Sequence, residues 1–323
     1  MADQGLLSKE KNWFVPAAHD GIRLDAFVRQ ILPHLSHREA QRAIDERLFL
    51  VNGRPGRKGA RLAASNVVSF VGPDLWLAEG PTPNPQLRVP IVYEDAQLLV
   101  VDKPAGMDTH GFSGRDCETL ANFLAAAHPE VLGIGKSRWE PGLVHRLDRE
   151  TSGLVLVAKR QAAFEHLRSQ FRRREIRKTY WALVWGASPA DGSVDYPLEH
   201  DAREKSRMRA VSAAPMQAKG QRIWQALTRF RTLGAARGLS LLEIEMVTGV
   251  THQIRVHLAA IGHPIVGDAV YRAQHTESFG LQRHFLHAGG LEFNHPEDGR
   301  RMKVEAGLPE GLQEVLERLA VKL

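Results

Sequence analysis

The stretch GLVHRLDRETSGLVLVAK, residues 142–159, joins a group of charged side chains to an apolar run. Its second half, Leu154–Ala158, is typical of a buried strand, because consecutive apolar residues suit a strand that is covered on both faces. The residues just before it, His145–Gly153, are mostly polar or charged. Charges enter protein cores only when they are paired or used in chemistry, so the start of this strand is a candidate functional site.

Asp148 is the candidate catalytic group of this stretch. Arg146 and Arg149 are its close neighbours in the sequence, and adjacent cations favour the ionised carboxylate, which can act as a nucleophile. A structural alternative is a strand entered through a turn, in which Asp148 accepts hydrogen bonds from backbone amides. The motif alone leaves both interpretations open.

The composition is that of a soluble globular protein. The 323 residues suffice for two or three domains, and 43% hydrophobic and 25% charged residues are ordinary values. A net charge of +6 points weakly to a polyanionic partner. The single cysteine, Cys117, excludes an intramolecular disulfide, and the sequence holds neither a membrane-spanning apolar stretch nor a signal peptide. We therefore expect a cytoplasmic protein with no membrane partner.

The fifteen histidines invite a metal hypothesis. They are scattered, however, and neither a His-Glu-x-x-His nor a Cys-x-x-Cys spacing occurs. His252 and His257 lie five residues apart on an expected helix, which is not the four-residue spacing of a helical ligand pair. We expect no metal site.

The N-terminal quarter predicts a polar tail over residues 1–15 and a small α/β domain over residues 16–75. Ser36 and Glu39 have the spacing of a capping box, which predicts the start of a helix. Asn52–Gly53 predicts a tight turn between two strands.

Cations dominate part of this small domain. Between Ser36 and Arg61, seven arginine or lysine residues stand against three acids. Some belong to a helix face that can simply be solvated, but the basic loop after the turn favours contact with phosphates. The candidate RNA-binding residues are Arg38, Arg42, Arg54, Arg57 and Lys58.

Residues 76–90 predict a linker, because Pro81, Pro83 and Pro85 favour an extended and semi-rigid backbone. The remaining residues, 91–323, predict one domain of short strands with a few helices. Strands often follow one another without a helical crossover, which indicates an α+β fold with a mixed, largely antiparallel sheet.

Two local expectations concern the second half of this domain. Ile223–Arg231 has the apolar pattern of a single strand. Thr251 precedes an expected helix that ends near Ile261, and threonine is a favoured N-cap residue, so we expect its side chain to cap that helix.

Three separate motifs resemble signatures of the RluA-type pseudouridine synthases, which isomerise uridine within RNA. They are HRLD with TSG in residues 145–153, KTY in residues 178–180, and TGVTHQIRVH in residues 248–257. Because independent motifs coincide in the right order, the resemblance is specific. It implies a bent sheet with an RNA cleft across its middle, chemistry without cofactor or metal, and a monomer.

The small N-terminal domain resembles the alpha-L RNA-binding motif that is shared with a ribosomal small-subunit protein. The matching residues are Arg23–Asp25, Ser36–Arg42 and Val51–Gly53. Several RluA-type synthases carry this module before the catalytic domain. The resemblance therefore implies an RNA partner, with large-subunit ribosomal RNA favoured and transfer RNA possible.

The resemblance assigns roles to three catalytic residues. Asp148 matches the family's catalytic aspartate, which either attacks the sugar or initiates its deprotonation. Tyr180 would stack on the target base and take part in late proton removal. Arg255 would pair with Asp148, because an arginine fork orients a carboxylate and keeps it charged.

Further residues would handle the RNA. Arg146 matches the position that fills the space left by the flipped base, and His145 would support the same loop. Ile254 would contact the flipped base from below. Basic side chains in and just before the KTY motif would contact substrate or RNA phosphates. They are Arg172, Arg173 and Lys178. Val250 departs from the family, which usually has arginine or lysine there.

Two other classes of protein compete with this interpretation. One is a catalytically inactive RNA-binding protein, against which the presence of Asp148, Tyr180 and Arg255 argues. The other is a nucleosidase or glycoside hydrolase, which usually needs a second carboxylate as acid. Glu150 is too close in sequence to Asp148 for an easy opposing placement.

Overall fold

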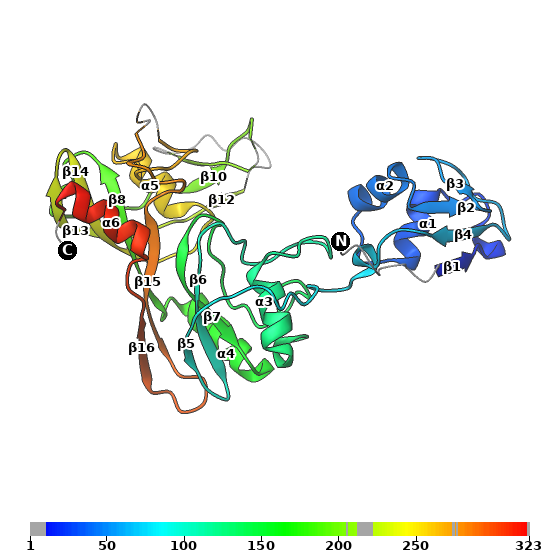
Figure 1. The fold of residues 1–323 in the computed structure, drawn as a ribbon, viewed down its shortest axis with the longest axis horizontal. Coiled ribbons are helices and arrows are strands. Elements are labelled where there is room, and N and C mark those ends of the chain that lie inside the picture. The colour runs from blue at the N-terminus through cyan, green and yellow to red at the C-terminus, as the bar shows by residue number, and fades with distance from the viewer. Residues whose placement is uncertain (1–10, 205, 212–221, 273–274, 276, 322–323) are drawn as a thin grey trace, which may run out of the picture. The chain divides into compact units, whose positions relative to one another are not determined.

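The computed structural model describes residues 11–204, 206–211, 222–272, 275 and 277–321. These residues form two compact units, whose elements are labelled in Figure 1. The first unit contains residues 11–83 together with the segment 111–117, and the second contains residues 84–110 and those from 118 onward.

The described part of the first unit is a four-stranded antiparallel sheet in the order β1-β4-β2-β3, with two helices. The predicted capping box is present, since Ser36 Oγ accepts from Glu39 N and the Glu39 carboxylate accepts from Ser36 N. The elements are β1 (Lys11–Phe14), α1 (Leu24–Ile31), α2 (His37–Asp45), β2 (Phe49–Val51), β3 (Arg54–Pro55) and β4 (Val67–Phe70), with short 3-10 helices at Ala17–His19 and Asp74–Leu77.

The strand β1 corrects one expectation. Residues 11–14 lie within the predicted polar tail. They nevertheless pair antiparallel with β4, and Trp13 packs against the core of this unit. Only residues 1–10 of the predicted tail lie outside the described residues. The sequence of β1, KNWF, has two polar residues followed by two aromatic ones, so it lacks the alternation by which a half-buried strand is recognised.

The described residues of the second unit form a nine-stranded sheet in the order β5-β6-β7-β15-β8-β14-β13-β9, with β16 paired to β15. Among these strands only β7 and β15 pair in parallel, so the predicted mixed, largely antiparallel sheet is confirmed. The strands are β5 (Ile91–Glu94), β6 (Leu98–Lys103), β7 (Ser152–Ala158), β8 (Arg177–Trp185), β9 (Asp191–Val194), β13 (Thr228–Ala236), β14 (Leu239–Met246), β15 (Leu286–Asn294) and β16 (Arg301–Glu305).

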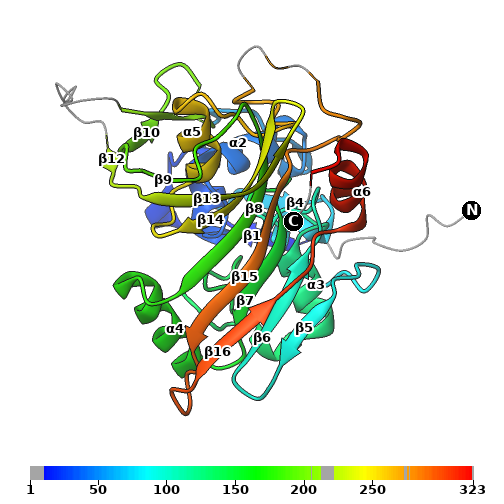
Figure 2. The same ribbon diagram turned by 90° about the vertical axis from the view of Figure 1, so that its left-hand side faces the viewer.

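Helices cover both faces of this sheet, which is why β7 is apolar throughout. Leu154 and Leu156 pack in one core cluster with α4, whereas Val155 and Val157 pack in another with α3 and α6. In Figure 2, β13 runs across the view while β6 and β15 run steeply down it, so the sheet is strongly twisted. The helices are α3 (Leu120–Ala127), α4 (Gln161–Arg173), α5 (Gln253–Ala260) and α6 (Glu310–Leu319), with a 3-10 helix at Pro129–Val131.

A small separate sheet packs on α5. It consists of β10 (Leu198–His200), β11 (Met208–Ala210) and β12 (Ile223–Trp224). The single strand predicted over 223–231 is therefore wrong: β12 belongs to the small sheet and β13 to the large one. The chain changes sheets at Leu227, whose nitrogen donates to Thr248 Oγ1 and whose carbonyl oxygen accepts from Gln253 Nε2 and from Val247 N, just after β14. None of the described helices is long and apolar enough to cross a membrane.

Gly153 lies where β7 and β15 approach most closely. Its φ is +121°, and a Cβ atom there would lie 2.3 Å from the Ala288 carbonyl oxygen and 2.6 Å from its nitrogen. Glycine is needed because no other residue combines this backbone conformation with so close a neighbouring strand. The glycine of the TSG motif thus joins β7, and the Asp148 loop before it, to the middle of the sheet.

Gly153→Ala should lower the free energy of unfolding by about 3 kcal/mol, because the methyl group must displace the β15 backbone at an unfavourable φ. Urea unfolding measures the loss. Gly238→Ala is the matched control, since Gly238 also has a positive φ (+73°) but nothing lies within 4 Å of its added Cβ. It should cost only about 1 kcal/mol, and equal losses in the two variants would contradict the close-approach argument.

Candidate active site

A cavity of about 520 Å³ opens in the second unit beside Asp148. This volume lies in the usual range of small-molecule sites. Its walls come from the loop before β7, the C-terminal part of α4, β8, and the segment from the end of β14 into α5. The sequence-predicted residues that line it are His145, Arg146, Asp148, Arg172, Lys178, Tyr180, Ile254 and Arg255.

Asp148 sits in a turn that leads into β7. Thr151 N donates to the Asp148 carbonyl oxygen, and Leu147 is fixed on the other side, since its nitrogen and its carbonyl oxygen both bond Thr109 Oγ1. The Asp148 side chain is 22% exposed, so the carboxylate is accessible from the cavity. Arg255 Nη1 lies 3.3 Å from Asp148 Oδ2, which is the pairing that the resemblance implied.

Arg255 has a second and stronger partner that the sequence analysis missed. Its Nε and Nη2 donate to the two carboxylate oxygens of Asp268 at 2.7 and 3.0 Å. Asp268 is fully buried and also accepts from the nitrogens of Val270 and Tyr271. Burial opposes charge on both groups, but their mutual attraction outweighs it, raising the pKa of Arg255 and lowering the pKa of Asp268.

A sequence signal for Asp268 did exist. It directly follows the apolar pair Ile265–Val266 and a glycine, as Asp148 follows apolar residues in its own motif. A charge that is adjacent to a buried apolar run must be paired. Because Asp268 lies 120 residues from Asp148 in the sequence, no local pattern indicates that both carboxylates contact Arg255.

Tyr180 and Lys178 lie two residues apart on β8 and therefore share one face of the strand. Burial, assisted by the charge of Asp148, raises the pKa of Tyr180 above its usual range, so the phenol stays protonated. Lys178 Nζ donates to the Thr248 carbonyl oxygen at 2.9 Å, and burial lowers the pKa of this lysine to about 8.

His145 supports the loop from beneath. Its Nε2 accepts from Leu156 N at 2.9 Å, and its ring packs 5.1 Å from the Phe171 ring. Burial lowers the pKa of His145 to about 3, so the imidazole is neutral at physiological pH. Arg146 is exposed at the cavity and makes no hydrogen bond or ion pair with any described residue.

The C-terminal end of α4 adds cations to the cavity wall. Arg172 lines the cavity, but Arg173 does not, because it bonds Glu175 and Ser169 instead. Arg174, which continues the same basic run, lines the cavity as well, and so does Arg168, which was not predicted. A run of consecutive arginines at the end of a helix does not by itself indicate which of them face the cavity.

The start of α5 differs from expectation. Thr251 does not cap the helix: the N-cap is His252, which has a left-handed backbone (φ 56°). Gln253 Oε1 instead accepts from Thr248 Oγ1 and Val250 N, fixing the turn. Histidine is one of the few residue types enriched in this conformation, which still costs of the order of 1–3 kcal/mol. Val250 packs partly buried against the core of the small sheet.

A basic hollow in the first unit contains Arg54, Arg57 and Lys58. Arg47 and Arg61 also line it and were not singled out by the sequence analysis. The α2 arginines, Arg38 and Arg42, do not line the hollow; both are exposed, and Arg42 pairs with Glu46 at 2.7 Å.

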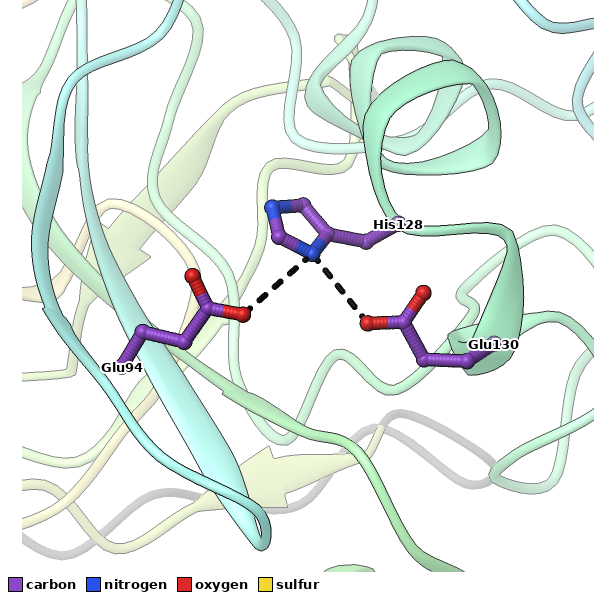
Figure 3. Close-up of side chains that lie close together, drawn as sticks. All are labelled: Glu94, His128 and Glu130. Carbon is purple, nitrogen blue, oxygen red and sulfur yellow. Dashed lines mark hydrogen bonds and ion pairs between the residues drawn. The ribbon is translucent and has the colours of Figure 1, made fainter.

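One group of potential metal ligands occurs among the described residues, and it lies away from this cavity. Figure 3 shows His128 Nδ1 facing the carboxylates of Glu94 and Glu130. Lys159 Nζ lies 2.6 Å from Glu94 Oε1 and 3.5 Å from Glu130 Oε1, where a bound cation would have to compete with it. The group is therefore a salt-bridge network. The expectation of no metal stays a prediction.

Two parts of the chain match known protein families. Residues 97–260 match the family model for RNA pseudouridylate synthase, and residues 22–66 match the S4 domain. An uncharacterized RNA pseudouridine synthase of Chloroflexus aurantiacus is 38% identical, over 97% of this chain and 95% of its own. The ribosomal large subunit pseudouridine synthase D of Zymomonas mobilis is 34% identical, over 93% and 95%.

A solved structure agrees with these sequence matches. Human RNA pseudouridylate synthase domain containing 4 has a TM-score of 0.58 and 26% identity, over 72% of this chain and 94% of that chain. Fold and sequence together define an RNA-modifying isomerase with an RNA-binding domain. The chain belongs to the RNA pseudouridine synthase family, and the RluA-type resemblance with its alpha-L (S4) module is confirmed.

RNA binding should weaken as the pH rises through about 8, because the buried Lys178 ammonium then loses its proton and its charge at the cavity. Fluorescence anisotropy of labelled RNA, from about pH 6.5 to about 9.5 at constant ionic strength, measures the step. Lys178→Arg should remove the step, since guanidinium stays charged in this range. A step that persists in this variant would belong to another group and contradict the assignment.

Proposed function

We propose that this protein converts uridine to pseudouridine at specific positions of large-subunit ribosomal RNA, with Asp148 as the catalytic carboxylate. The observation that carries the proposal is the contact of Asp148 with Arg255 at a cavity that Tyr180 also lines. The relatives named for the ribosomal large subunit supply the choice of RNA.

The reaction requires a base to leave its stack. The uracil must lose its bond from ring nitrogen to the sugar, rotate, rejoin the sugar through carbon 5, and then lose the proton on that carbon. Unstacking costs a few kcal/mol, and Arg146, exposed and unpaired among the described residues, is suited to fill the vacated place. Tyr180 and Ile254 offer ring and apolar surface for the extruded base.

Arg255 orients the Asp148 carboxylate. Because Asp268 holds the guanidinium through two hydrogen bonds, Nη1 has a fixed position from which it meets Asp148 Oδ2. Asp148 Oδ1 has no hydrogen-bond partner among the described residues. It is therefore free to attack the sugar or to initiate its deprotonation.

RNA contact extends over both units. We assign residues 16–75, together with β1 (Lys11–Phe14), to an RNA-binding domain, 76–90 to a linker and 91–323 to the catalytic domain. Cationic side chains on each domain would contact the phosphates of the RNA. They are Arg38, Arg42, Arg54, Arg57 and Lys58 on the first, and Arg172, Arg173 and Lys178 on the second.

Other functions have less support. Asp148 is the sole acid among the described residues that line the cavity, and Glu150 instead lies near Arg149 (3.6 Å), so a hydrolase with an opposed acid is disfavoured. Transfer RNA remains the second candidate substrate. We also propose a cytoplasmic monomer that needs no cofactor.

Asp148→Asn should lower turnover by about a thousandfold or more, because an amide is neither a nucleophile nor a base. Tritium release from RNA labelled at uridine carbon 5, with ribosomal and transfer RNA as separate substrates, measures turnover and identifies the RNA class. RNA affinity should stay within about twofold. Retained release would refute the role of Asp148, and release from transfer RNA alone would refute the ribosomal assignment.

Removing the three cations of the basic hollow together, in Arg54→Ala/Arg57→Ala/Lys58→Ala, should weaken RNA binding and reduce the slope of log affinity against log salt by about 2–3. Binding titrations at several salt concentrations give the slope. Arg29→Ala is the control for charge loss, since Arg29 is exposed on α1 outside the hollow. An unchanged slope in the triple variant would exclude the hollow from the RNA interface.

A further inference from the structure

We propose that the Tyr271 hydroxyl fixes His252 in the tautomer whose Nε2 carries the proton, and that this N–H is directed at the Asp148 carboxylate. His252 is then a positioning residue, which holds one oxygen of Asp148 and leaves the other to react. The inference rests on the proposed catalytic role of Asp148, but the tautomer itself can be observed without any activity.

The hydroxyl of Tyr271 has two neighbours. Its oxygen accepts a hydrogen bond from Met208 N at 2.9 Å, and it lies 2.9 Å from His252 Nδ1. The tyrosine is buried (6% exposed), so water cannot readily replace either partner. Met208 belongs to β11, so the contact ties the small sheet to the first turn of α5.

Hydrogen-bond accounting selects the tautomer. The Met208 amide can only donate, so the Tyr271 hydroxyl must give its own hydrogen to another acceptor. Among the described residues, His252 Nδ1 is the acceptor in reach. A neutral imidazole whose Nδ1 accepts carries its proton on Nε2. The opposite tautomer would leave a buried hydroxyl hydrogen without a partner, which is unfavourable.

The protonated nitrogen lies close to the catalytic carboxylate. His252 Nε2 is 3.9 Å from Asp148 Oδ2, the same oxygen that Arg255 Nη1 approaches at 3.3 Å. The distance exceeds that of a hydrogen bond, but catalytic contacts often close only when substrate is bound. Burial lowers the pKa of His252, which keeps the ring neutral with a single donor.

The backbone and the packing around His252 hold the ring in this orientation. The residue has a left-handed φ of 56°, and the rings of His252 and Tyr271 meet edge to face, with centroids 5.7 Å apart. Tyr271 is itself fixed, because its nitrogen donates to Asp268 and its ring lies 5.1 Å from the Arg255 guanidinium. Strained residues at functional sites are retained where the surroundings over-determine them.

The first test reads the tautomer directly. Protein labelled with nitrogen-15 histidine gives ring correlations that distinguish a protonated Nε2 from a protonated Nδ1, and the spectrum of His252→Asn identifies the resonances of His252. The wild type should show the Nε2–H form, and Tyr271→Phe should lose this preference. A protonated Nδ1 in the wild type would overturn the proposal.

The second test follows single-turnover rates and RNA affinity. His252→Asn keeps a residue that tolerates the left-handed backbone and can accept from Tyr271 through Oδ1, but its shorter side chain lacks the Nε2–H that faces Asp148. This variant and Tyr271→Phe should each slow the chemical step roughly tenfold to a hundredfold, as expected for a misplaced reacting group, with RNA affinity within about twofold of the wild type. The double variant should be no slower than the slower single variant, because Tyr271 acts on Asp148 only through His252.

Two control variants separate this role from general damage. Tyr93→Phe removes a hydroxyl that donates to Asp95, and His263→Asn removes a ring that bonds the Trp185 carbonyl oxygen; neither residue lines the cavity. Both should keep the wild-type rate. Unchanged rates in His252→Asn and Tyr271→Phe, or losses of affinity that parallel the losses of rate, would overturn the positioning role. Absence of turnover in the wild type would instead refute the proposed function and leave the tautomer test standing.

Discussion

The buried ion pair between Arg255 and Asp268 is the interaction on which the site depends. A planar guanidinium that is held at two nitrogens has one orientation, so its remaining nitrogen reaches Asp148 at a defined place. Breaking such a pair by removing one partner typically costs about 3–5 kcal/mol, because the other charge stays buried. The stability of the α5 region and the geometry of the Asp148 carboxylate are therefore coupled.

The segment around Asp268 also connects distant parts of the second unit. Its carboxylate accepts from Tyr271 N, while the Tyr271 hydroxyl reaches both β11 and His252. The loop that carries Asp148 is held independently, by Thr109 on one side and by the close approach of β7 to β15 at Gly153 on the other. Two separately anchored segments thus meet at Asp148, which favours a preorganised site.

Charge at the cavity is strongly one-sided. Five cationic side chains line it (Arg146, Arg168, Arg172, Arg174 and Lys178), in addition to Arg255, and Asp148 is the sole acid among the described lining residues. This distribution suits a polyanionic ligand such as RNA, because the cations can contact its phosphates while the carboxylate faces an uncharged base. The lowered pKa of Lys178 reflects the free-energy cost of keeping such a charge buried in the absence of RNA.

The sequence by itself determined the local elements and the family. The capping box at Ser36, the apolar strand at Leu154–Ala158 and the three motifs depend on residues that are near one another in the chain, so local patterns predict them. Only the tertiary structure decided which charges become partners. Asp268, the left-handed His252, the inward-facing Arg168 and the break between β12 and β13 all depend on contacts between distant segments, which no local pattern encodes.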